Sequence, residues 1–116
     1  MTSVYIERDG KRCTVDVRGH AATEPLCAAI SCLLYTLEGW LNNATGVRIL
    51  CERLSPGEAR LEWRAENVVA EYDSITVIEL MEIGFLQLRE TEPEHMTVEI
   101  VDDGAEKSAP DADAGF

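Results

Sequence analysis

The sequence lacks any long apolar run and any apolar leader that would direct the chain out of the cell. Its longest apolar-leaning stretch, residues 26–37, is twelve residues long, whereas a membrane-spanning helix needs about 20. Residues 1–9 carry charges, at Glu7 and Arg8 among others, where a signal peptide would be apolar. We therefore predict a cytoplasmic protein that does not contact a membrane.

Basic residues are also scarce, with 10 Lys and Arg against 22 Asp and Glu, for a net charge of −12. Such a surface repels phosphate backbones, which argues against a nucleic-acid partner. It favours a basic protein or peptide as partner, although acidity for solubility alone would explain the same excess. The length indicates one domain, which we place at 1–101. Residues 102–116 are rich in Asp, Ala and Gly and predict an acidic disordered C-terminal tail.

No C-x-x-C pair occurs among the cysteines, and the two histidines, His20 and His95, are far apart in sequence. This spacing gives little support for a zinc site, and we predict no metal and no cofactor. In a reducing compartment all four thiols, at Cys13, Cys27, Cys32 and Cys51, are expected to be free.

Alternation and turn residues predict five strands. Residues 2–7 lead to Asp9-Gly10, a strong hairpin-turn signal. In 11–18 the apolar side chains at every second position predict a half-buried strand with Cys13 on its inner side. Two further strands, about 47–54 and 59–65, flank the turn residues Ser55-Pro56-Gly57-Glu58, and a last one follows at 95–101 with His95 at its end or on the surface. The side that Cys51 faces is left open.

Two segments have helical periodicity. The first, about 25–43, begins near Pro25 with Thr23 or Glu24 as its cap. It is apolar nearly all round, so a partner subunit is expected to cover its second face, and Cys32 is predicted to be core. The second, about 74–89, is capped by Asp73 or Ser74 and has an apolar stripe that predicts core packing: Ile78, Met81, Phe85 and Leu88.

The predicted order is β-β-α-β-β-α-β. It favours a two-layer α+β fold with a mostly antiparallel sheet of about five strands and both helices on one face. His20 ends a strand, and Cys27 lies in the first turn of the following helix. Unpaired N–H groups and the positive dipole end of a helix favour thiolate, and could also hold an oxyanion. A nearby imidazole could act as base. The alternative is a buried core cysteine, the commoner role of Cys in an apolar helix.

The segment Gly19-His20-Ala21, an acidic residue at Glu24 and Cys27-Ala28-Ala29-Ile30-Ser31 together resemble the signature of the ribosomal-processing cysteine proteases. That family carries Gly-His-Ala, a loop, and a segment of the form Asp-Ile-Val-Cys-Ala-Ala-Val-Ser. The element order of 1–101 is similar, and Glu92-Pro93-Glu94-His95-Met96 resembles the family's Tyr-Pro-Glu-Tyr before its last strand.

The resemblance implies a homodimeric peptidase of the bacterial cytoplasm that removes the N-terminal extension of a large-subunit ribosomal protein. It implies Cys27 as nucleophile and His20 as general base, with Gly19, Glu24 and Ser31 in support: Glu24 as cap or orienting group, Ser31 as a structural residue. The partner would be a basic ribosomal protein precursor or its N-terminal peptide.

Two departures from the family pattern bear on activity. The segment between His20 and Cys27 is about half as long as in typical members, and Glu24-Pro25-Leu26 replaces Asp-Ile-Val. The alternative function is therefore a catalytically inactive dimeric relative that binds a peptide or a ribosomal protein. A redox role for Cys27 and Cys32 is disfavoured, because helical positions five apart point in different directions.

Overall fold

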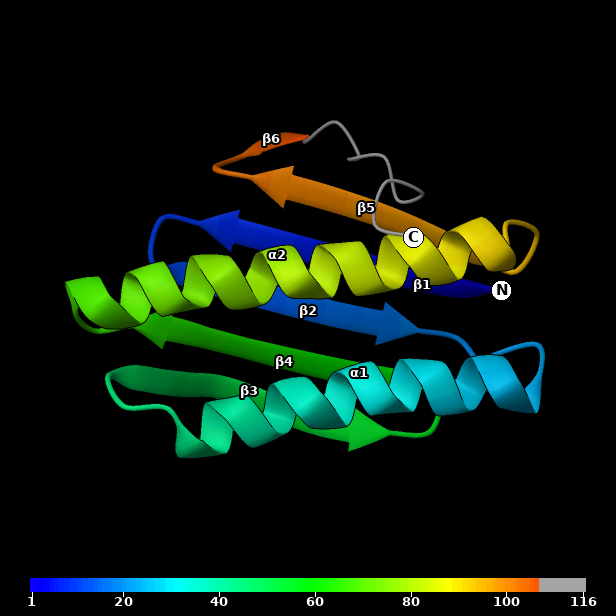
Figure 1. Cartoon of the computed structure of the whole chain (residues 1–116), viewed down its shortest axis with the longest axis horizontal. Helices are drawn as coiled ribbons and strands as arrows, with labels where there is room; N and C mark the ends of the chain where they lie inside the picture. The colour runs from blue at the N-terminus through cyan, green and yellow to red at the C-terminus, as the bar shows by residue number, and fades with distance from the viewer. Residues whose placement is uncertain (107–116) are drawn as a thin grey trace.

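The computed structural model describes residues 1–106, and these form two layers, a sheet with both helices on one face (Figure 1). This confirms the predicted α+β fold and the order β-β-α-β-β-α-β, to which a two-residue strand is added. Neither helix within 1–106 is long and apolar enough to cross a membrane. The elements are β1 (Thr2–Asp9), β2 (Arg12–Arg18), α1 (Glu24–Asn43), β3 (Val47–Ser55), β4 (Glu58–Ala65), α2 (Val68–Thr91), β5 (Met96–Asp102) and β6 (Ala105–Glu106).

The sheet has the strand order β3-β4-β2-β1-β5-β6. Every neighbouring pair is antiparallel except β1 and β5. These two are parallel because β4 runs in the same direction as β1, and α2 returns the chain along the sheet before β5 begins. The short strand β6 corrects the predicted tail, since 102–106 form the end of a hairpin rather than the start of a disordered segment. Asp103 and Gly104 have φ of 51° and 84°, the left-handed pair of a tight hairpin turn. The rest of the predicted tail, 107–116, lies outside the described residues.

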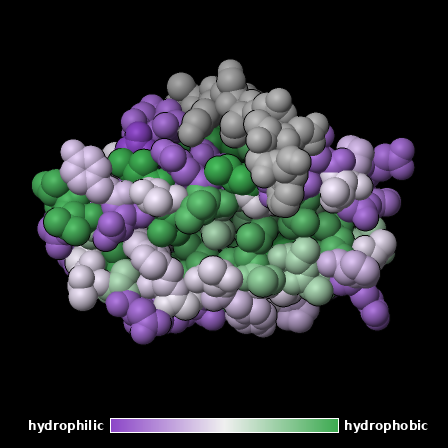
Figure 2. Space-filling view, in the orientation of Figure 1, coloured by the Kyte–Doolittle hydropathy of each residue, from purple (hydrophilic) through white to green (hydrophobic). Residues whose placement is uncertain are grey.

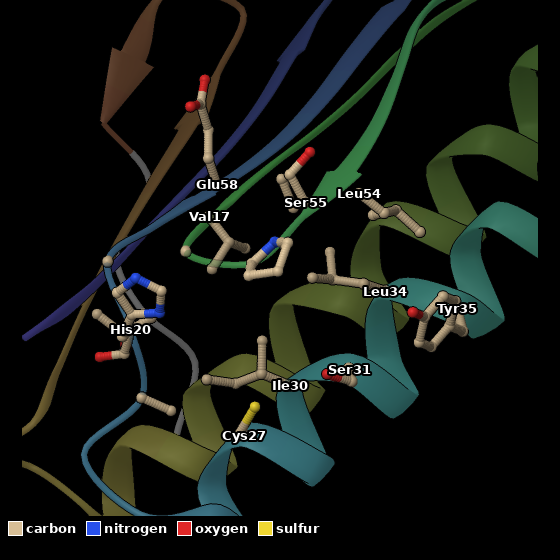
Figure 3. A pocket seen from close by; sticks show the side chains of 16 residues that line it. Val17, His20, Cys27, Ile30, Ser31, Leu34, Tyr35, Leu54, Ser55 and Glu58 are labelled. Carbon is tan, nitrogen blue, oxygen red and sulfur yellow. The ribbon is translucent and has the colours of Figure 1, made fainter.

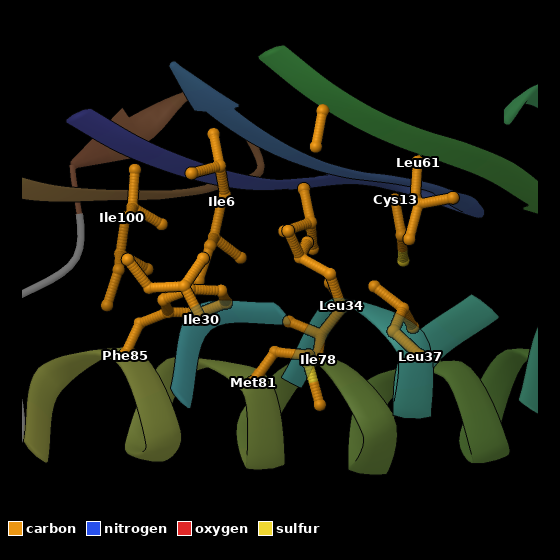
Figure 4. Close-up of a cluster of buried hydrophobic side chains, with 14 of the residues drawn as sticks. Ile6, Cys13, Ile30, Leu34, Leu37, Leu61, Ile78, Met81, Phe85 and Ile100 are labelled. Carbon is orange, nitrogen blue, oxygen red and sulfur yellow. The ribbon is translucent and has the colours of Figure 1, made fainter. Parts of the chain in front are cut away.

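The core fills the space between the helices and the sheet (Figure 4). As predicted, α2 turns Ile78, Met81 and Phe85 toward it. Trp63 is fully buried, meets the ring of Trp40 edge-on at a centroid distance of 5.9 Å, and donates its Nε1–H to Ser74 Oγ at 3.0 Å. α1 contributes one buried stripe: Leu26, Ile30, Leu34, Leu37 and Leu41.

The second apolar face expected on α1 is largely covered within the chain. Leu33 and Trp40 are partly buried against the same core, and Leu33 lies so close to Gly84 of α2 that a Cβ there would come within 2.8 Å of Leu33 Cδ2. Apolar surface instead runs along the helix layer (Figure 2). The large exposed apolar residues of α2 are Val68, Val69, Tyr72, Leu80 and Ile83.

The second helix begins six residues earlier than predicted and ends two later. Its cap is Asn67, whose Oδ1 accepts the N–H of Ala70 at 2.8 Å, and not Asp73 or Ser74. The prediction missed this first stretch because Val68 and Val69 are exposed and break the core-facing stripe. Ser74 lies inside the helix, where it is buried and accepts the Trp63 hydrogen bond.

The strand β2 is buried on both faces, not on one as predicted. On the face without helices, Asp16 is buried beneath Arg18 and Arg60, which donate to its carboxylate at 3.0 and 2.9 Å. Burial alone would raise the pKa of Asp16, but the hydrogen bonds from both arginines outweigh it and hold this pKa below its ordinary value. Thr14 is buried on the same face, where it lies between Glu7 of β1 and Glu62 of β4.

Candidate active site

The backbone between β2 and α1 turns sharply over five residues, 19–23. Gly19 has φ of +93°, and a side chain there would collide with the backbone oxygen of Met1. Only glycine suits both conditions. The Gly19 N–H donates to the carbonyl of Gly57 at 2.9 Å. The end of β2 is thereby tied to the β3–β4 turn directly before His20.

The start of α1 is capped by Thr23, whose side chain accepts the N–H of Leu26 at 3.3 Å. Of the two predicted caps, Thr23 is right and Glu24 is not, since Glu24 is the exposed first helical residue. The N–H of Cys27 donates to the Thr23 carbonyl at 3.0 Å, and Pro25 has no N–H. The expectation that first-turn N–H groups are free to hold an oxyanion is therefore wrong for Leu26 and Cys27.

A cavity of about 260 Å³ opens between the first half of α1, the end of β2 and the β3–β4 turn (Figure 3). His20 and Cys27 both line it, as do Gly19 and Ser31, whereas Glu24 does not. His20 borders the cavity from the loop after β2, and the Cys27 side chain projects into it from α1. Its remaining lining residues are Thr2, Val17, Ala21, Ile30, Leu34, Tyr35, Leu54, Ser55, Pro56, Gly57, Glu58 and Ala59.

Cys27 is exposed, so the alternative that it is a buried core cysteine is wrong. Ser31 and Tyr35 follow at intervals of one helical turn on the same side of α1 and also line the cavity. Among the described residues, no hydrogen bond joins Cys27 to His20. The two side chains thus line one cavity without a hydrogen bond between them, and transfer of the thiol proton to the imidazole would require one to form.

The other cysteines lie away from this cavity. Cys13 is buried as predicted, and burial raises the pKa of its thiol to about 12. Cys32 is exposed, so its predicted place in the core is wrong, because the core-facing stripe of α1 passes through Ile30 and Leu34 on either side of it. Cys51 is half-buried and pairs with Glu62, on the face without helices.

The second histidine, His95, does not line the cavity. His95 directly precedes β5, one residue outside the strand rather than its first residue as predicted, and its carbonyl accepts the N–H of Thr2 at 2.9 Å. Within residues 1–106, no three side chains of His, Cys, Asp or Glu are grouped so that they could hold a metal ion.

Nothing in the sequence indicated that two parts of the cavity wall would belong to the site. Thr2 lies beneath His20, and its Oγ1–H donates to the His20 carbonyl at 3.3 Å. The turn Ser55-Pro56-Gly57-Glu58 forms the part of the wall next to His20, although the sequence predicts it only as a turn. Thr2 reaches the site through the pairing of β1 with β2, and the turn through the pairing of β4 with β2.

Comparison with known proteins gives no match to a protein-family model and none to a curated sequence. Solved structures are similar along most of the chain. SMU.848 from Streptococcus mutans is 22% identical, with a TM-score of 0.65 over 88% of this chain and 98% of the other. Structures of the essential ribosomal processing protease Prp from S. aureus have TM-scores of 0.66 over 86% of this chain and 99% of theirs. The chain has the Prp fold.

The two Prp structures are complexes with a covalently linked product peptide, at 19% identity, and with a substrate peptide, at 17%. At these identities the likeness is one of fold. It confirms the predicted resemblance of element order and topology to that protease.

Proposed function

We propose that this protein is a cysteine endopeptidase in which Cys27 is the nucleophile and His20 the general base. The observation that carries the proposal is that both side chains line one cavity, with the thiol exposed to it. The shared fold with Prp, a protease that has been captured with peptides, supports a peptide as the occupant of the cavity.

In the proposed reaction, His20 takes the thiol proton and the Cys27 sulfur attacks the carbonyl carbon of a peptide bond. The C–N bond then breaks, the imidazolium gives its proton to the departing amine, and a thioester remains on the enzyme. Water, deprotonated by the same imidazole, attacks the thioester, releases the acid and restores the thiol.

The proposed substrate is the N-terminal extension of a basic ribosomal protein precursor, processed in the cytoplasm. The chain's net charge of −12 supports a basic partner, because opposite charges steer association. Most of the cavity lining is apolar, so the segment bound in the cavity itself would present apolar side chains and leave its basic flanks to the surface.

The test is the rate of Cys27 alkylation by iodoacetamide as a function of pH, followed by peptide mass. We expect rapid labelling at pH 6–7 in the wild type and a loss of about tenfold or more in His20→Ala, because imidazolium favours the thiolate. His95→Ala is the matched control, since His95 does not line the cavity. Labelling that follows an ordinary thiol pKa near ~8.5 in all three proteins would contradict the proposal.

The missing hydrogen bond between His20 and Cys27 and the engaged N–H groups of the first turn favour a second candidate. This is a catalytically inactive peptide- or ribosomal-protein-binding relative that keeps the cavity. It predicts ordinary thiol reactivity together with measurable binding of a basic ribosomal N-terminal peptide. The enzyme predicts cleavage of the same peptide, abolished in Cys27→Ser.

We further propose that the protein is a homodimer, with the exposed apolar residues of α2 as the contact in place of α1. Leu80 and Ile83 lie in the middle of this helix and are 57% and 44% exposed. Sedimentation at micromolar concentration is expected to give twice the 12.8 kDa of one chain, and Leu80→Glu is expected to give a monomer. A wild type that sediments as a monomer would contradict this.

A further inference from the structure

The β3–β4 turn lies against the loop that carries His20. Gly57 is at its centre with φ of +74°, and its carbonyl accepts the N–H of Gly19 at 2.9 Å. This bond joins two loops that are almost forty positions apart in sequence and fixes the backbone immediately before His20.

The Gly57 Cα also lies against the imidazole itself. A Cβ built on Gly57 would come within 2.8 Å of both Cε1 and Nε2 of His20, and within 3.2 Å of Cδ2. Real Cβ atoms do not approach other atoms so closely, so any larger residue at this position must push the ring away. The imidazole is a flexible side chain on an exposed residue, so it can move at little cost in stability.

We propose that Gly57 is a positioning residue for His20. Its carbonyl holds the loop before His20 through the Gly19 N–H, and its lack of a side chain lets the imidazole pack against the turn at the edge of the Cys27 cavity. The role rests on the proposed function, in which the direction of the His20 ring decides whether it can take the thiol proton. Gly57 touches neither the sulfur nor the reacting atoms and acts through His20 alone.

The chain offers a matched control for the backbone cost of a substitution. Gly10 sits in the β1–β2 turn with φ of +61°, and a Cβ there would meet nothing within 4 Å. Gly10→Ala and Gly57→Ala therefore carry the same left-handed strain. Only Gly57→Ala displaces the imidazole.

The experiment compares wild type, Gly10→Ala, Gly57→Ala and His20→Ala in the full chain. We expect both glycine variants to lower the urea midpoint by a similar amount. We expect the imidazole proton resonances of His20, assigned with His20→Ala, to shift in Gly57→Ala and to stay in place in Gly10→Ala. Cys27 alkylation at pH 6.5 should fall about tenfold in Gly57→Ala, because one unit of thiol pKa changes the thiolate fraction tenfold.

Failure of this inference and failure of the proposed function give different results. If His20→Ala slows alkylation but Gly57→Ala behaves like Gly10→Ala, Gly57 has no positioning role while the Cys27–His20 pair stands. If His20→Ala alkylates as fast as the wild type, the proposed function fails, and the His20 resonances alone decide whether Gly57 sets the ring. Resonances that are unmoved in Gly57→Ala, or moved equally in both glycine variants, overturn the inference in every case.

Discussion

Along α1, the side that faces the sheet and the side that faces the cavity differ in chemistry. The first carries the leucine stripe of the core, represented by Leu37 at 1% exposure. The second carries Cys27, Ser31 and Tyr35, which are exposed or half-buried, and it meets the core stripe at Ile30 and Leu34, which also border the cavity. The core side supplies stability through apolar burial, whereas the cavity side contributes little burial and presents polar and reactive groups. Stability and reactivity in this helix should therefore be separable by substitution.

The largest contrast is expected between the thiols of Cys13 and Cys27. Burial raises the pKa of Cys13 to about 12, so its thiolate is scarce at neutral pH as well as inaccessible. We expect iodoacetamide at pH 7.5 to alkylate Cys27 at least about a thousandfold faster than Cys13 in the folded protein. The measurement is peptide mass against time, with urea-unfolded protein as the control in which both react. Comparable rates in the folded state would mean that β2 is open to solvent.

Truncation on the two sides of α1 should separate stability from surface contacts. Leu37→Ala is expected to cost ~2–5 kcal/mol of unfolding free energy, because it leaves a cavity in the core. Tyr35→Ala, at a residue 63% exposed on the cavity side, should cost less than ~1 kcal/mol. Urea unfolding measures both. Equal losses would contradict the division of the helix into a core side and a cavity side.

The loss of a buried polar contact should cost an unfolding free energy between those of Leu37→Ala and Tyr35→Ala. Ser74→Ala removes the acceptor of the Trp63 Nε1–H inside the core, and an unsatisfied buried donor costs ~1–3 kcal/mol. Ser55→Ala, at an exposed serine of the cavity wall, should change unfolding free energy by less than ~0.5 kcal/mol. In a Trp63→Phe background the cost of Ser74→Ala should shrink, and a cost unchanged there would show that the hydrogen bond is not its source.

The smallest effect is expected from pH on the helix-free face of the sheet. Because Arg18 and Arg60 hold the pKa of Asp16 below its unfolded value, the ionised carboxylate stabilises the fold. This stabilisation is complete above about pH 5 and is lost as pH falls through the unfolded value near ~3.9 and on to the folded one. Unfolding free energy measured from pH 6 to pH 3 should therefore fall more steeply in the wild type than in Asp16→Asn. Parallel curves would contradict the assignment.

Periodicity and turn residues predicted most of the fold. In β2 and in α2 through Phe85, the residues that face the core are apolar, and this gives each element a recognisable period in the local sequence. The start of α2 does not show this period, since Val68 and Val69 are apolar but face away from the core. β6 was missed although Asp103-Gly104 is a turn signal of the same kind as Asp9-Gly10.

The cavity was predicted only in part. His20 and Cys27 were identified because both lie in one short segment whose pattern is local and similar to a known family. Gly57 and Thr2 could not be found in this way. They reach the site through the β3–β4 hairpin and through β1, whose positions next to His20 depend on strand order and register.

The sequence by itself determined the order of the seven main elements, limited the cap of the first helix to Thr23 or Glu24, and identified His20 and Cys27 as candidate residues, because each depends on neighbours a few positions away. Only the tertiary structure decided that Cys27 and Cys32 are exposed, that α2 and not α1 carries the exposed apolar surface, and that Gly57 borders the imidazole. The physical reason is that burial and contact depend on packing between segments distant in sequence, and the periodicity of a single segment does not contain that information.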